Sequence, residues 1–166
     1  MMDKSGKRRA ALGLAVLLVF ATYLGSGGRP DDLLKIDNSV QPKRLSRGEE
    51  GRIILKLQIQ EGVFLSAQPF FIIEFAPMPE IVFPKNFFTA SDLNIGLIEE
   101  KTGSSIDLSK PIEVPFTVSL DAKPGGHILV GRIKYFARSP QEGWCYKTTS
   151  KFSVAFSTRT TVFKKK

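Results

Sequence analysis

Short apolar runs with a period of two residues alternate with turn-forming residues over most of this chain. Between residues 52 and 60, Ile or Leu occupies every second position, and most of the intervening side chains are polar. Residues 151–157 repeat the pattern, with Phe152, Val154 and Phe156 on one side. A two-residue period sends alternate side chains to opposite faces of a strand, so both segments are predicted to be half-buried β-strands.

The remaining apolar runs are short and are bounded by proline and glycine. They lie at residues 63–65, 70–75, 81–83, 93–98, 112–120 and 127–137. Pro115 predicts an edge position for its strand, because proline cannot donate a hydrogen bond to a neighbouring strand. Eight or nine short strands at this spacing favour an all-β sandwich, and the 13 phenylalanines are expected to dominate its core.

The first residues have the pattern of a secretory signal. Four basic residues between positions 4 and 9 precede an uncharged apolar run at residues 10–24, and small residues follow. Residues 1–28 are therefore predicted to be a signal peptide or an uncleaved helical anchor in the inner membrane. Either outcome exports the rest of the chain from the cytoplasm. A buried helix of a cytosolic domain is the alternative.

After this segment the chain is long enough for one domain but not two. Residues 29–44 are rich in Pro, Asp and Asn and are interpreted as a linker or an entry segment. Residues 45–163 form the predicted sandwich, and residues 164–166 are a basic tail. The formal net charge is +8. Because no cluster of arginines with interleaved aromatic residues accompanies it, a nucleic-acid partner is not expected.

The chain lacks the residues that most catalytic mechanisms need. His127 is the only histidine and Cys145 the only cysteine, so no set of three or four metal ligands is expected. Ser139 and Ser150 lack the glycine-flanked context of a hydrolase nucleophile. Phosphate loops and dinucleotide fingerprints are absent from the sequence. We therefore expect neither a metal nor a cofactor.

Cys145 is the candidate functional residue. An exported thiol without a partner in its own chain is buried, bonded to another molecule, or reactive. Trp144 and Tyr146 flank it and favour packing within a core. Arg138 and Lys147 are close in sequence, and positive charge favours the reactive thiolate. The buried and the reactive interpretations both stay open.

The segment around Cys145 resembles the active-site hairpin of a redox module. Residues 131–138 and 143–146 are similar to the N-terminal periplasmic domain of DsbD, of the thiol:disulfide interchange (disulfide bond corrector) family. The resemblance extends from Val40 to Phe156. It implies an immunoglobulin-like antiparallel β-sandwich that accepts electrons from a membrane partner and reduces disulfides of client oxidoreductases. A family loop that shields the active site would fall within residues 85–92.

The chain departs from this family at one position. Cys145 matches the second active-site cysteine of the family, and Arg138 stands where the first would be. A single thiol can form a mixed disulfide but cannot resolve it within the chain, so independent dithiol catalysis is not expected. Arg138 is expected to be the electrostatic neighbour of Cys145. Tyr135, Trp144 and Tyr146 are expected to shape a binding site around the thiol.

Three functional hypotheses follow from these observations. The first is an accessory or protein-binding module in periplasmic thiol–disulfide homeostasis, with a thioredoxin-like or other thiol-containing envelope protein as partner. The second is a non-catalytic structural or interaction sandwich of the cell envelope in which Cys145 is buried. The third is a monothiol exchange enzyme that depends on glutathione or a partner thiol. Exposure of Cys145 beside Arg138 would favour capture of a partner, and burial under Trp144 would favour the structural hypothesis.

Overall fold

The computed structural model describes residues 33–68, 70–101 and 103–162, and all regular structure in them is β-strand. The strands are β1 (Leu34–Gln41), β2 (Arg44–Arg47), β3 (Glu50–Ile59), β4 (Phe64–Ser66), β5 (Ile72–Phe75), β6 (Ile81–Val82), β7 (Phe87–Thr89), β8 (Leu97–Glu100), β9 (Gly103–Ile106), β10 (Ile112–Val118), β11 (Gly125–Ser139) and β12 (Trp144–Val162). The predicted signal or anchor helix and the basic tail lie outside the described residues. Within these residues, no helix is long and apolar enough to cross a membrane.

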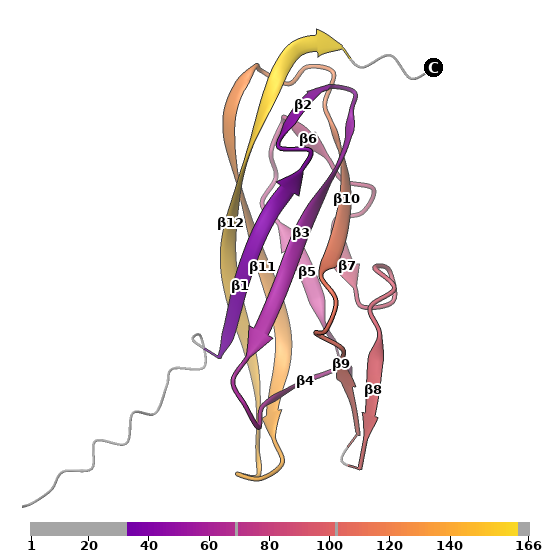
Figure 1. The fold of residues 1–166 in the computed structure, drawn as a ribbon, viewed down its shortest axis with the longest axis vertical. Helices are drawn as coiled ribbons and strands as arrows, with labels where there is room; N and C mark the ends of the chain where they lie inside the picture. Colours follow the sequence, from indigo (N-terminus) through magenta and orange to yellow (C-terminus); the bar gives the residue numbers. More distant parts are fainter. Residues whose placement is uncertain (1–32, 69, 102, 163–166) are drawn as a thin grey trace, which may run out of the picture.

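Two sheets pack face to face. The front sheet has the order β1-β3-β10-β6 and is antiparallel throughout. The back sheet has the order β2-β12-β11-β4-β9-β8, with β5 beside β11 and β7 beside β5. Figure 1 shows β1 and β3 crossing in front of β11. Alternate residues of each strand face the space between the sheets, which is the core.

The connectivity is that of an immunoglobulin-like sandwich. The order β1-β3-β10-β6 corresponds to strands A, B, E and D, while β12, β11 and the interrupted β4/β5 correspond to G, F and C. Between β1 and β2 the chain passes from one sheet to the other, and β2 then pairs in parallel with β12. The predicted all-β, immunoglobulin-like antiparallel sandwich is confirmed.

The segment expected to be a linker contains the first strand instead. β1 pairs with β3 along its whole length, and Leu34 and Val40 are buried in the core. The interpretation as a linker was wrong for residues 34–41. The inward-facing residues of β1 include Asn38, which dilutes the apolar alternation that would have predicted a strand. Proline and aspartate around the strand further obscured the pattern.

β10 was expected at an edge because it contains Pro115, but it lies between β3 and β6. β6 pairs only with Thr117 and Val118 of β10. Pro115 pairs with Arg52 of β3 and lies beyond the short β6. An interior strand therefore tolerates a proline here, because β6 does not extend as far as Pro115.

Leu, Ile and Val make up most of the buried core, so the expectation that phenylalanine dominates it was wrong, but aromatic rings form a connected cluster within it. Phe75 stacks on Phe83 with ring centroids 4.5 Å apart and meets Phe152 edge-on at 5.8 Å. The ring of Phe152 occupies the space beside Gly131 of β11, where an added Cβ would collide with it. Gly131 is therefore required for the close approach of β11 to this ring.

Candidate functional site

Cys145 lies near the start of β12, beside the turn that closes the β11–β12 hairpin. It is exposed, and it pairs directly with Arg138 in the antiparallel ladder. Residues directly opposite each other in such a ladder project to the same face of the sheet. The thiol and Arg138 therefore share the outer face of the back sheet, at the end of the molecule where the β8–β9 hairpin also ends (Figure 1).

The guanidinium of Arg138 is held on the side of β11 away from Cys145. One nitrogen, Nη2, lies 3.3 Å from Glu100 Oε2 and donates a hydrogen bond of 2.9 Å to the carbonyl of Gly103. The guanidinium also lies over the Phe64 ring, 5.6 Å from its centroid. Only 11% of the Arg138 side chain is exposed. Its charge is therefore partnered by Glu100, and Arg138 joins β11 to the β8–β9 hairpin.

The three aromatic residues expected around the thiol belong to the opposite face. Tyr135 is fully buried, and its hydroxyl lies 3.0 Å from the hydroxyl of Ser150. Trp144 is half-buried against the core and stacks on Tyr146 at 5.0 Å. Because residues 144 and 146 alternate with Cys145, they project to the face opposite to the thiol. The expected binding site of Tyr135, Trp144 and Tyr146 around Cys145 is not formed.

The neighbours of Cys145 on its own face are Lys147, which proximity in sequence had suggested, and phenylalanines that it had not. Phe136 pairs with Lys147, and its ring meets Phe70 edge-on at 5.1 Å. The Lys147 ammonium lies over the Phe70 ring, 5.1 Å from its centroid. Phe64 lies directly opposite Arg138 on β4. The two-residue period could have identified Phe136 and Lys147, because each lies two positions from Arg138 or Cys145.

Further along the same face, basic side chains surround one carboxylate. Glu74 accepts hydrogen bonds from Lys134 at 2.8 Å and from Arg132 at 2.6 Å. These bonds, that from Lys134 foremost, hold the pKa of Glu74 below its ordinary value although partial burial opposes the shift. Lys151 lies directly opposite Arg132 and is exposed. We call the outer surface formed by Arg132, Lys134, Lys147 and Lys151 the cationic face.

The segment expected to shield the active site lies beside β5. Residues 87–89 form β7, which pairs with β5, and the following turn is fixed by Asp92. The Asp92 carboxylate accepts hydrogen bonds from the backbone and hydroxyl of Thr89, at 2.9 and 2.8 Å, and pairs with Lys85. These contacts, that with Lys85 first, lower the pKa of Asp92 to about 2. The segment that reaches Arg138 is instead the β8–β9 hairpin.

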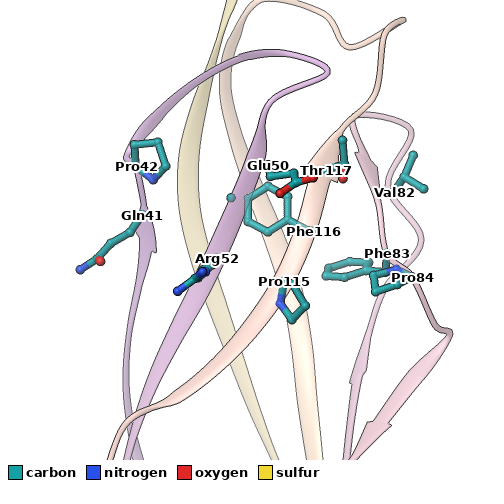
Figure 2. A pocket seen from close by; sticks show the side chains of 11 residues that line it. Gln41, Pro42, Glu50, Arg52, Val82, Phe83, Pro84, Pro115, Phe116 and Thr117 are labelled. Carbon is teal, nitrogen blue, oxygen red and sulfur yellow. The ribbon is translucent and has the colours of Figure 1, made fainter. Parts of the chain in front are cut away.

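The front sheet has an open recess of about 710 Å³ where β6 ends. Figure 2 shows Arg52 and Pro115 in the middle of its lining, with Gln41 and Pro42 at one side and Val82, Phe83 and Pro84 at the other. Arg52 donates to Glu113 at 2.8 Å, so its charge is already paired. Neither a nucleophile beside a base nor a set of metal ligands is found among the residues that line this recess.

His127 has a structural role. Its Nε2 lies 2.9 Å from the Lys123 carbonyl and 2.8 Å from the Thr158 hydroxyl, and its ring packs on Phe156 at 5.1 Å. Over the described ranges, no group of three or more His, Cys, Asp or Glu side chains is placed to hold a metal ion.

Among known proteins, similarity to this chain is found only with solved structures. No family model matches the chain, and no curated protein matches it. A cohesin module from a Clostridium perfringens family 33 glycoside hydrolase is 11% identical, with 77% of this chain and 96% of that chain covered and a TM-score of 0.38. Murine CRIg is 9% identical over 76% and 98% of the two chains, with a TM-score of 0.33. The seventh ScaB type I cohesin of Pseudobacteroides cellulosolvens is 8% identical over 79% and 96%, with a TM-score of 0.34.

Proposed function

We propose that this chain is an exported accessory module that captures a thiol-containing partner protein through Cys145, as a relative of the DsbD N-terminal domain without dithiol catalysis of its own. The observation that supports the proposal is the exposed thiol of Cys145 at the end of an open sheet face, opposite Arg138. A disulfide of another protein can approach such a thiol. The hypothesis of a cysteine buried under Trp144 is wrong on this point, because the thiol is exposed and Trp144 projects to the other face.

The chemistry is one thiol–disulfide exchange. The Cys145 thiolate attacks one sulfur of a disulfide in the partner, and a new S–S bond forms as the partner's second sulfur leaves as a thiolate. That thiolate takes up the proton released by Cys145, so the number of disulfides is unchanged. Because the chain holds no second cysteine, resolution depends on a thiol of the partner or on a small thiol.

Trapping of mixed disulfides tests this function. The full chain would be produced in a bacterial periplasm, quenched with acid, alkylated, and separated under non-reducing conditions, with adducts identified by mass spectrometry. We expect adducts with thioredoxin-like or other thiol-containing proteins that disappear in the Cys145→Ser variant. A Lys56→Cys substitution in that variant places an exposed thiol on the front sheet instead, and it should not restore the same adducts.

Two results would contradict the proposal. Absence of any Cys145-dependent adduct would remove the thiol from the function. Equal capture by the relocated thiol at position 56 would show that exposure alone, and not the surface around Cys145, determines reactivity.

A further inference from the structure

The outer face of the back sheet carries exposed apolar side chains in the first half of β11. Ile128 and Val130 of β11 are 66% and 48% exposed, and Ala155 of β12 lies directly opposite Ile128. On the front sheet, β3 carries the polar residues Lys56 and Gln58 on its outer side. Apolar residues that adjoin one another on a sheet face are a common feature of interaction surfaces.

A recess connects this apolar patch to the cationic face. It has a volume of about 370 Å³ and is lined by apolar residues together with Glu74, Arg132 and Lys151. Val130 belongs to its wall, so the patch and the recess are continuous. A hollow of this size accommodates one or two side chains of a partner.

The charge on the rim of the recess is incompletely balanced. Glu74 is hydrogen-bonded to Arg132 and Lys134, which shows that a carboxylate fits between two cations on this surface. Lys151 projects beside Arg132 and, within the part of the chain that the structure describes, has no ion-pair partner. A carboxylate from another molecule would complete this arrangement.

We propose that the cationic face and its apolar recess bind an acidic polypeptide segment of a partner protein, with carboxylates on Lys151 and Lys147 and an apolar side chain in the recess. A second copy of this chain is a poor occupant, because a two-fold dimer would bring two cationic faces together. An anionic membrane is also disfavoured, because Ile128 and Val130 lie within a strand and not on an amphipathic helix or in a loop. The proposal rests on the proposed role as a protein-binding module, but not on the thiol.

Nuclear magnetic resonance titration of the full chain carrying Cys145→Ser tests the surface without its thiol. The probe is a soluble synthetic peptide in which glutamate alternates with valine, and a lysine–valine peptide is the control. We expect amide shifts centred on β5, β11 and β12, and affinity that falls as salt is added. Lys151→Glu should weaken binding about fivefold or more, because an attraction becomes a repulsion. Lys56→Glu on the front sheet makes the same change in net charge and should weaken it far less.

A matched pair of variants tests whether the exposed apolar side chains contribute to peptide binding. Ile128→Ser should weaken peptide binding, whereas Val82→Ser, a similarly exposed position on the front sheet, should not. Shifts absent from the cationic face, or equal losses in Lys151→Glu and Lys56→Glu, would overturn the proposal. Binding to phosphatidylglycerol vesicles with the same dependence on Lys151, and none to the peptide, would overturn it in favour of a membrane. Peptide binding by Cys145→Ser, together with no Cys145-dependent mixed disulfide in the unsubstituted chain, would retain this surface and remove only the thiol function.

Discussion

The two outer faces of the sandwich differ by one pair of like charges. On the front sheet, cations and carboxylates face each other: Lys56 lies opposite Asp37, and Arg52 donates to Glu113. On the back sheet, Arg132 lies opposite the carboxylate of Glu74 on β5 but opposite a second cation, Lys151, on β12. Like charges directly opposite on a sheet are destabilising, so the Arg132–Lys151 pair departs from the rule for stability that the other pairs follow. Such departures are expected where a surface is kept for binding, and this difference motivates the assignment of the partner to the back sheet.

The largest effect is expected beneath the cationic face. Gly131→Ala should lower the free energy of unfolding by about 1–3 kcal/mol, because the added methyl group would displace the Phe152 ring or β11 itself. Urea denaturation measures this loss. Gly126→Ala in the same strand is the control, since no atom lies within 4 Å of its Cβ position, and its effect should stay within about 0.5 kcal/mol. Equal effects at the two positions would show that the Phe152 contact does not determine the packing of the back sheet.

The second comparison uses one arginine ion pair from each face. Arg138 is mostly buried against Phe64 and Glu100, whereas 66% of the Arg52 side chain is exposed. Arg138→Ala should cost about 1 kcal/mol or more and accelerate amide hydrogen exchange in the β8–β9 hairpin, because Glu100 loses its partner in a partly buried place. Arg52→Ala should cost less than about 0.5 kcal/mol.

Equal losses of stability in Arg138→Ala and Arg52→Ala would contradict this account. Unchanged exchange in the hairpin after Arg138→Ala would mean that the contacts to Glu100 and Gly103 do not anchor it. The rate of Cys145 alkylation by neutral iodoacetamide, measured on the same variant, reports whether Arg138 also influences the thiol.

The sequence predicted where the strands lie more fully than which strands and side chains are adjacent in the sheet. The two-residue period was sufficient for β3 and for residues 151–157 of β12, although β12 begins at Trp144. It also contains the information that Tyr135 faces inward when Arg138 faces outward. The prediction that Trp144 would lie around the thiol rested on proximity in sequence, and it was wrong because adjacent residues of a strand project to opposite faces. The contact between Arg138 and Glu100 joins residues 38 positions apart, and no local pattern specifies which hairpin lies beside which strand.

The loss of stability in acid is expected to differ between a carboxylate of the back sheet, Glu74, and one of the front sheet, Glu113. The pKa of Glu74 is lowered in the folded protein, so its stabilising contribution is present above the ordinary value of about 4.5 and is lost as the pH falls through the lowered value. Glu74→Gln should therefore reduce the free energy of unfolding by up to about 1 kcal/mol at neutral pH and by less in acid. Denaturation at several pH values measures this difference. Glu113→Gln on the front sheet is the control and should give a smaller difference, because this ion pair is more exposed.

The smallest effects have opposite signs and test the comparison most directly. Lys151→Glu replaces a like-charge pair by an Arg132–glutamate pair and should stabilise the fold by a few tenths of a kcal/mol. Lys56→Glu places a second carboxylate opposite Asp37 and should destabilise it by about as much. Paired thermal denaturation at low salt resolves such differences, and added salt should reduce both. If Lys151→Glu instead destabilises the protein, Lys151 contributes to the fold, and its position opposite Arg132 no longer indicates a surface kept for a partner.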